Sequence, residues 1–425
     1  MKVAIVHDYI KEYGGAERVL ETLLEVYPNA TVFTTLYAPE FLGPHRARFE
    51  KYNIKTTFLN YIPFRHRLIS PLRLLSPLAF SSLDLSSYDV VIVSQTGAYF
   101  PNLVRKITKN QEPRTKNNAV LICYTHTPPR YLYGYATARD WKKNKIFAVI
   151  AGFANHFLRM IDFNSSKNVD FFIANSEEVR ARIKKFYRRE SIVIYPPVDT
   201  AGGRWQVAGG KKSTSHEPRA TSYYLTGGRL ARAKGIDVIV NSFNENGKAL
   251  KIFGKGFAGY ESELRSLANG KWQMADGNQR DSGQAPTNRD PDNIGARMTD
   301  SNIEFLGEVN DEEKLDLMRN AKAFVFASYD EDFGITPVEA MSVGTPVIAY
   351  KSGGVKETVI DKKTGIFFDE NTPEALISAI KEFERSKIDP KDCIKQAEKF
   401  SKERFEKNIN EFVNSKIKRK NIIIK

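Results

Sequence analysis

Two glutamates with seven residues between them stand in the densest group of polar residues in the chain. Glu331 and Glu339 follow the apolar segment 323–327, whose length and composition predict a strand. Pro337 is typical of the first turn of a helix, which places Glu331 in the preceding loop and Glu339 near the helix N-terminus. The free backbone N–H groups of residues 334–336 would then face a cleft, where a diphosphate or a sugar hydroxyl can bind them. Taken alone, the two glutamates could equally be an ordinary helix-capping pair.

Two segments of the N-terminal half place further polar groups at the ends of strands. The glycine pair at 14–15 follows the strand-like residues 3–6 and precedes a helix, which lets the backbone approach a phosphate or an acceptor closely. Many doubly wound domains need such glycines only for turning. His126 ends another apolar run and is followed by Arg130 and Tyr131. A lone histidine is more often a structural residue, and these neighbours make it a site candidate.

Short apolar runs alternate with helix-length amphipathic stretches along the chain. In the N-terminal half, the predicted strands are residues 2–6, 30–34, 90–94, 120–124 and 171–175, and the predicted helices are 17–27 and 177–186. In the C-terminal half, the predicted strands are 222–225, 250–253, 303–305, 323–327 and 346–350, and the predicted helices are 235–244, 311–320, 337–343 and 373–383. This alternation is typical of a parallel, doubly wound sheet. The sequence therefore predicts an α/β fold with two Rossmann-like domains that face a cleft.

The predicted boundary between these domains falls near residue 196, at a turn-like segment rich in proline. The predicted units are residues 1–195, 196–400 and 401–425, and a long charged helix is expected over 397–417. Residues 201–220 and 269–299 are polar and have little to bury, so we expect them to be surface excursions.

The segment around Glu331 and Glu339 resembles the E-x7-E motif of retaining glycosyltransferase family 4. Other motifs that fall in the order and spacing of this family are Gly227–Leu230, Lys234–Gly235, Phe305–Val309, Gly344–Ala349 and Gly353–Gly354. The match is nearest to the branch of bacterial O-antigen and exopolysaccharide mannosyltransferases, through His7–Tyr9, Gly14–Arg18, Cys123–Pro128 and Tyr195–Asp199. The resemblance implies the GT-B fold, in which a C-terminal helix returns to the N-terminal domain.

The resemblance also implies a role for each matching residue. Glu331 would contact hydroxyls of the donor sugar, and Glu339 would accept from the ribose hydroxyls. Arg229 and Lys234 would bind the diphosphate. His126 would lie near the reacting sugar and position it, so Glu331 and His126 are the candidate catalytic residues. The other residues expected to bind the donor are Gly15, Val309, Phe333, Gly334 and Ile335.

The implied reaction is transfer of a hexose from a nucleotide diphosphate sugar with retention of configuration, and GDP-mannose is the first expectation for the donor. The departing diphosphate gains negative charge, which fixed cations and helix N-termini can stabilise in place of a metal. We therefore expect no metal and no cofactor besides the donor. Asp330 and Asp332 form a D-x-D, which binds a divalent ion on a different glycosyltransferase fold. The spacing is short and common, so a loop-capping pair is favoured here.

Composition and charge bound the remaining possibilities. A chain of 425 residues is long for one hydrophobic core, and 64 basic against 50 acidic residues give a net charge of +14. Such an excess attracts nucleotides, nucleic acids or anionic lipid surfaces. Two cysteines, an N-terminus without a signal-peptide pattern and an apolar stretch at 146–154 that is too short to span a bilayer indicate a reducing, cytoplasmic setting.

Basic and apolar residues interleave at 61–69 and 72–75. This pattern suits insertion at an anionic headgroup layer, although an amphipathic core helix with a solvated basic face explains it equally well. The candidate acceptor and membrane contacts are Arg65, Arg67, Arg73, Arg130 and Tyr131. The expected partners are therefore a lipid-linked or glycan acceptor and the anionic inner face of the cell membrane, with the protein bound peripherally.

Other functions fit the sequence less well. A nicotinamide-dependent oxidoreductase would need a G-x-G-x-x-G motif with an acidic ribose ligand, and neither half opens with one. A GT-B sugar-nucleotide epimerase would share the fold and the donor without an acceptor. A UDP-sugar-dependent glycosyltransferase would share the reaction. A non-catalytic or nucleic-acid-binding protein could use the positive charge, but the basic residues form no recognisable nucleic-acid module.

Overall fold

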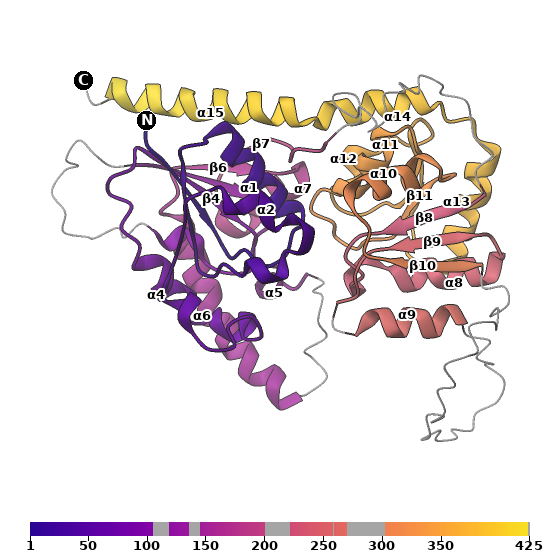
Figure 1. The fold of residues 1–425 in the computed structure, drawn as a ribbon, viewed down its shortest axis with the longest axis horizontal. Helices are drawn as coiled ribbons and strands as arrows, with labels where there is room; N and C mark the ends of the chain where they lie inside the picture. The colour runs from indigo at the N-terminus through magenta and orange to yellow at the C-terminus, as the bar shows by residue number, and fades with distance from the viewer. Residues whose placement is uncertain (105–118, 136–144, 200–221, 258, 270–301, 424–425) are drawn as a thin grey trace.

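Buried apolar runs form two separate parallel sheets, one in each half of the chain (Figure 1). The computed structural model describes residues 1–104, 119–135, 145–199, 222–257, 259–269 and 302–423. The expected surface excursion at 201–220 lies outside the described residues, as does all but the first residue of the excursion at 269–299.

The first sheet has seven parallel strands in the order β3-β2-β1-β4-β5-β6-β7. The strands are β1 (Val3–His7), β2 (Thr31–Thr34), β3 (Ile54–Thr56), β4 (Val90–Gln95), β5 (Val120–Thr125), β6 (Phe171–Ala174) and β7 (Ser191–Val193). The helices of this half are α1 (Gly15–Val26), α2 (Arg46–Glu50), α3 (Ile69–Leu72), α4 (Ser76–Ser81), α5 (Arg130–Tyr133), α6 (Lys145–Ser166) and α7 (Glu177–Tyr187). Every residue of β1, β4 and β5 is buried, because helices cover both faces of a parallel sheet.

The second sheet has six parallel strands in the order β10-β9-β8-β11-β12-β13. The strands are β8 (Tyr224–Gly227), β9 (Leu250–Phe253), β10 (Ile303–Gly307), β11 (Phe324–Phe326), β12 (Val347–Tyr350) and β13 (Gly365–Phe368). The helices are α8 (Ile236–Asn246), α9 (Tyr260–Asn269), α10 (Asp311–Arg319), α11 (Ile335–Ser342), α12 (Val355–Thr358), α13 (Pro373–Arg385), α14 (Pro390–Ala397) and α15 (Lys402–Ile423).

Helix boundaries follow local capping signals in the sequence. The Ser176 side chain accepts from the Val179 N–H at the start of α7, and the Thr372 side chain accepts from the Ala375 N–H at the start of α13. α13 has Pro373 in its first turn, where a missing N–H costs nothing. α11 begins at Ile335, so Pro337 lies in its first turn.

Both sheets share one topology, and this topology determines where a ligand can bind. The strand order reverses between β1 and β4 in the first sheet and between β8 and β11 in the second. In open parallel sheets, ligands bind outside the carboxyl ends of the strands at such a reversal. The glycine pair at 14–15 follows β1, and the loop with Glu331 follows β11, so both lie at these positions.

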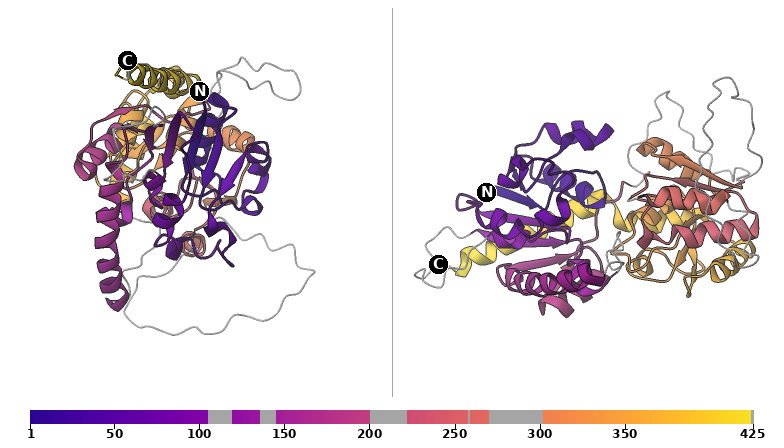
Figure 2. Two further views of the ribbon diagram at one scale, coloured as in Figure 1. Left: turned by 90° about the vertical axis from the view of Figure 1, so that its left-hand side faces the viewer. Right: turned by 90° about the horizontal axis from the view of Figure 1, so that it is seen from below.

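The chain passes between the two domains twice, and the two crossings pair with each other. The Val198 N–H donates to the Phe400 carbonyl oxygen at 3.0 Å. α15 then runs along the first domain (Figures 1 and 2), and its residues Phe405, Ile409 and Val413 belong to the same core cluster as the buried residues of α1. The C-terminal helix therefore ties the two domains together.

The single helix expected over 397–417 is wrong in one respect. α14 ends at Ala397, a 3₁₀ turn η7 (Glu398–Phe400) follows, and α15 begins only at Lys402. Ser401 between them is extended, with ψ of 156°, because it pairs with Val198 and its side chain accepts from the Arg404 N–H. Among the described residues, no helix combines the length and the apolar character needed to cross a bilayer.

Candidate active site

Glu331 lies in the loop after β11 and is paired with a lysine from the turn after β8. The Lys234 ammonium, in η6 (Arg232–Lys234), lies 2.6 Å from Glu331 Oε2, and the Ser328 hydroxyl donates to the same oxygen at 2.6 Å. Burial alone would raise the pKa of Glu331, but Lys234 and Arg130 outweigh burial and lower the pKa to about 2. The carboxylate is therefore ionised and held at neutral pH.

Gly353 and Gly354 lie against the backbone of the Glu331 loop. The Gly354 N–H donates to the Glu331 carbonyl oxygen at 2.7 Å. Gly353 has φ of +67°, and a Cβ on it would lie 2.2 Å from the same carbonyl oxygen. A side chain at residue 353 would therefore push the Glu331 loop out of place.

Glu339 lies on α11 and is neutralised from both domains. Arg18 of α1, in the first domain, donates to Glu339 Oε1 at 2.5 Å, and Lys314 of α10 donates to the same oxygen at 2.9 Å. Glu339 is only 4% exposed, and burial would raise its pKa, but Lys314 and Arg18 lower it. Glu339 thus has one cationic partner from its own domain and one from the opposite domain.

The Asp330–Asp332 pair joins the domains. Asp332 Oδ1 accepts from Arg182 at 2.6 Å and lies 2.8 Å from Arg130, both from the first domain. The same two arginines donate to the Asp330 carbonyl oxygen at 2.9 and 2.6 Å. Two guanidinium groups on one carboxylate leave it poorly suited to a divalent cation. The described residues also contain no cluster of three metal-ligating side chains.

The glycine loop after β1 meets the second domain at close range. Arg229 donates to Glu12 at 2.7 Å across the domain boundary. A Cβ on Gly15 would lie 2.7 Å from Ile335 Cδ1, so a side chain at residue 15 would have to displace the end of the Ile335 side chain. The structure thus brings Gly15, Arg229, Gly334 and Ile335 to the same region.

His126 follows β5 and is a neutral, nearly buried imidazole. It is 9% exposed, and its Nε2 lies 2.9 Å from the Ser94 hydroxyl at the end of β4. Burial, followed by repulsion from His7, lowers the pKa of His126 to about 3. Arg130, four residues further on, contacts the Asp330 carbonyl and so brings the His126 loop toward Glu331.

Two residues expected to bind the donor, Phe333 and Val309, have side chains that pack against the hydrophobic core. The Phe333 ring is 2% exposed and packs against Tyr195 and Phe400 at the domain crossings. Its side chain therefore belongs to the core, and only its backbone remains available to a donor. Val309 follows β10 at the carboxyl edge, where its side chain packs partly against the core of the second domain.

The expected membrane contacts divide into two groups. Arg73 lies 3.6 Å above the centre of the Tyr131 ring and donates to the Ala98 carbonyl at 3.0 Å, and Arg130 is committed to the domain interface. These three side chains are thus not free to contact lipid, because intramolecular partners hold them. Arg67 is exposed, and Arg65 is partly exposed, 3.8 Å from Glu40.

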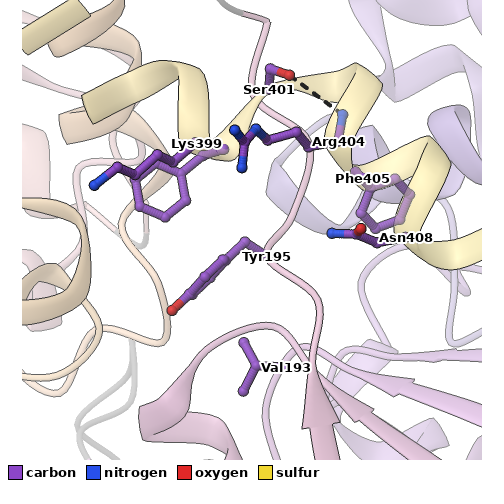
Figure 3. Close-up of a pocket in the computed structure, with 8 residues that line it drawn as sticks. Val193, Tyr195, Lys399, Ser401, Arg404, Phe405 and Asn408 are labelled. Carbon is purple, nitrogen blue, oxygen red and sulfur yellow. Dashed lines mark hydrogen bonds between the residues drawn. The ribbon is translucent and has the colours of Figure 1, made fainter. Parts of the chain in front are cut away.

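A cavity of about 300 Å³ lies at the crossings rather than at the facing carboxyl edges (Figure 3). Tyr195 comes from the first crossing, whereas Lys399 and Arg404 come from the second crossing and α15. None of the residues that the sequence predicts for the site lines this cavity.

Sequence reasoning missed several charged residues of the site. Arg18 lies inside the recognised Gly14–Arg18 motif, but its partner Glu339 is 321 residues away. Lys314 and Arg182 sit on helices whose sequence shows only ordinary amphipathic charge. Ser94 could have been found, since it ends a buried strand at the carboxyl edge.

We expect Asp332→Ala to loosen the contact between the domains. Arg182 is 2% exposed and would lose its shortest carboxylate partner, so the free energy of unfolding should fall by about 2–4 kcal/mol. Thermal unfolding measures the loss, and small-angle X-ray scattering should show a larger radius of gyration. The control is Glu177→Ala, because the Glu177–Arg180 pair is exposed and should contribute less than about 1 kcal/mol. Equal effects of the two substitutions would contradict the assignment of Asp332 to the interface.

Two family models match the chain in succession. The model described as Glycosyltransferase Family 4 matches residues 13–201, and the model described as Glycosyl transferases group 1 matches residues 211–400. The alpha-1,3/1,6-mannosyltransferase ALG2 of Dictyostelium discoideum is 24% identical over 398 residues, covering 86% of this chain and 85% of that protein. ALG2 of Kluyveromyces lactis is 23% identical, covering 85% and 71%.

Solved structures with the same fold cover nearly the whole chain. Sucrose-phosphate synthase from Thermosynechococcus elongatus superposes with a TM-score of 0.66 at 17% identity, covering 98% of this chain and 99% of that one. HepE of Anabaena, in complex with UDP and glucose, gives a TM-score of 0.65 at 17% identity, covering 98% and 100%. The lipopolysaccharide outer core galactosyltransferase WaaB gives 0.62 at 16% identity, covering 98% and 100%. The chain thus resembles family 4 in its first half and group 1 in its second half, it has the GT-B fold, and it is a glycosyltransferase.

Proposed function

We propose that this glycosyltransferase moves a hexose from a nucleotide diphosphate sugar to a lipid-linked glycan acceptor, with retention of configuration. The observation that carries the proposal is the 2.6 Å contact between Glu331 and Lys234 where the two domains face each other. A carboxylate suited to sugar hydroxyls thus lies directly beside an ammonium suited to a diphosphate.

Negative charge on the leaving group is what this site can stabilise. Lys234 and Arg229 supply positive charge, and the N-terminus of α11 adds free N–H groups beside them. A diphosphate beside Lys234 would compete with Glu331 for the ammonium and free the carboxylate to accept from sugar hydroxyls. Because protein groups supply these charges in fixed positions, the reaction proceeds without a divalent ion.

His126 positions the sugar in this scheme. Its pKa of about 3 keeps the imidazole neutral at pH 7, so it supplies a hydrogen-bonding ring and no charge. In a front-face reaction the departing phosphate takes the proton of the acceptor hydroxyl, and the site then needs no separate base.

GDP-mannose is the donor that we propose first. Both relatives described above are named as mannosyltransferases, and the sequence motifs resemble those of bacterial O-antigen and exopolysaccharide mannosyltransferases. The solved structures with the same fold share only 16–17% identity, so they carry no argument about the donor.

A ligand screen with the purified protein tests the donor. Tight binding raises the melting temperature by mass action, so GDP-mannose at roughly 100 times its Kd should add about 2.7 kcal/mol and raise the melting temperature by a few degrees. UDP-glucose, UDP-galactose and UDP-N-acetylglucosamine should give smaller shifts at the same concentration. Transfer to a lipid-linked glycan should persist within a few-fold in EDTA. If only a UDP sugar raises the melting temperature, that sugar nucleotide and not GDP-mannose is the donor. A full loss of transfer in EDTA that Mg²⁺ or Mn²⁺ restores would contradict the metal-free scheme.

Glu331→Ala should abolish transfer and leave the fold intact. Loss of a group that contacts the reacting sugar should lower kcat by roughly 100-fold or more. The Lys234 side chain is 33% exposed, so water can solvate the ammonium when its partner is removed. The control is Glu304→Ala, which removes an exposed carboxylate that pairs with Lys251 in the same domain. Unchanged turnover in Glu331→Ala would overturn the proposed role.

The first domain has an apolar surface suited to a lipid interface. α6 exposes Phe153 by 70%, Phe157 by 57% and Met160 by 46%, at a spacing that places them on one helix face. Residues 61–78 expose Tyr61, Phe64, Leu74 and Leu78 by at least 57% each. α4 and α6 both pack against η4 (Pro101–Val104), so these two groups lie at the same end of the domain (Figure 1). Together with the net charge of +14, they suit peripheral binding to anionic lipid at the cytoplasmic face of the cell membrane.

The variant Phe153→Ser with Phe157→Ser should weaken binding to vesicles. Each buried aromatic side chain contributes roughly 1.5–3 kcal/mol, so the partition coefficient should fall at least tenfold. Co-sedimentation with vesicles that contain phosphatidylglycerol measures the effect. The control is Ile360→Ser, because Ile360 is an exposed apolar residue of the other domain. Equal binding of the double variant and the unchanged protein would exclude α6 as a lipid contact.

A further inference from the structure

A line of buried polar side chains runs behind His126 at the carboxyl edge of the first sheet. His126 Nε2 lies 2.9 Å from Ser94 Oγ, and Ser94 Oγ lies 3.0 Å from His7 Nδ1. His7 Nε2 lies 3.6 Å from Glu17 Oε1, and Glu17 Oε2 accepts from the Gly14 N–H at 3.0 Å. The line thus connects the glycine loop after β1 to His126.

The Glu17 end determines the direction of each hydrogen bond. A carboxylate can only accept, so a proton on His7 Nε2 is favourable there, whereas a lone pair would face a negative oxygen. Among the residues that the structure describes, none forms a hydrogen bond with His7 Nε2 within 3.5 Å, and Glu17 is the acidic group that this nitrogen faces. A neutral His7 therefore carries its proton on Nε2 and has a bare Nδ1.

The unprotonated Nδ1 of His7 determines the direction of the hydrogen bond between Ser94 and His126. A serine hydroxyl has one proton, and Ser94 must use it to donate to His7 Nδ1. The Ser94 oxygen is then left as an acceptor for His126 Nε2, so this nitrogen carries the proton of the neutral His126 ring. Within the described part of the chain, Ser94 is the group that bonds to both histidines, so the effect of Glu17 reaches His126 through His7 and Ser94.

We propose that Glu17, His7 and Ser94 hold His126 in the tautomer that is protonated on Nε2 and bare on Nδ1. His126 then offers the donor a hydrogen-bond acceptor, and the group it recognises is a hydrogen-bond donor such as a sugar hydroxyl. Only the naming of this ligand rests on the proposed function. Glu17, His7 and Ser94 are positioning residues, since they act through His126.

Glu17→Gln should reverse the tautomer through two intervening side chains. The Gly14 N–H requires an oxygen, so the carboxamide oxygen stays on Gly14 and the NH₂ group faces His7 Nε2. His7 Nε2 must then accept, its Nδ1 must donate to Ser94, and Ser94 must donate to His126 Nε2. The proton of His126 moves to Nδ1.

Nitrogen NMR of the full chain labelled with [¹⁵N]histidine reads the tautomer directly. His126→Gln identifies its signals among those of the six histidines. We expect a protonated Nε2 in the unchanged protein, a protonated Nδ1 in Glu17→Gln, and a mixture of both in Ser94→Ala, where the connection is broken. A protonated Nδ1 in the unchanged protein, or the same tautomer in Glu17→Gln as in the unchanged protein, overturns the proposal.

Glu21→Gln is the matched control. Glu21 is on the same helix, but it accepts from Tyr13 and Arg48 and lies outside the line. This variant removes the same charge from α1 and should leave the His126 signals unchanged. A reversed tautomer in Glu21→Gln would overturn the proposal, because the effect would then come from charge alone.

Kinetics separate this proposal from the proposed function. With the donor that the screen identifies, Glu17→Gln should lower kcat by roughly 10- to 100-fold and change the donor KM by less than about threefold. The NMR result needs no donor. A reversed tautomer in a protein that turns over no nucleotide sugar would refute the proposed function and support the proton arrangement. Normal transfer in Glu17→Gln together with an unchanged His126 tautomer would refute the proton arrangement and support the proposed function.

Discussion

Ion pairs between carboxylates of the second domain and arginines of the first domain are the constraint on which this site depends. Asp332 is paired with Arg182 and Glu339 with Arg18, and each pair joins one domain to the other. A buried carboxylate without such a partner costs several kcal/mol. These pairs therefore stabilise the contact between the facing edges of the two sheets, and the same pairs bring together the groups that could bind a nucleotide sugar.

The same charges that stabilise the interface suit the chemistry that we propose. Lys234 is paired with Glu331 and partly exposed, so it can exchange one anionic partner for another at little cost in solvation. Arg182 is 2% exposed and bonded to several groups, so it cannot. The degree of burial thus distinguishes cations that stabilise the domain interface, such as Arg182, from cations that can bind a ligand, such as Lys234.

Much of the fold follows from the sequence, because parallel strands buried on both faces are continuous apolar runs bounded by turns. β9 was predicted at its observed residues, 250–253. Glu331 and Lys234 were recognisable because each lies within a local motif. The pairing of Glu339 with Arg18 and the packing of Phe333 on Phe400 were not, since these contacts join segments distant in the chain. Local patterns predict where a strand ends. They do not predict which side chain of the opposite domain contacts the residues that follow the strand.

The end of β4 also connects the His126 site to α6, the helix that exposes Phe153, Phe157 and Met160. Asp162 of α6 accepts from the hydroxyls of Tyr133 and Tyr187, and Gln95, beside Ser94, donates to Tyr187. Asp162 is buried, and burial raises its pKa to about 7 against the lowering by its two tyrosine partners. Buried polar groups with several partners resist displacement. Buried hydrogen bonds therefore join α6 to the strand that orients His126, so a lipid surface bound to α6 would orient the cleft relative to the membrane.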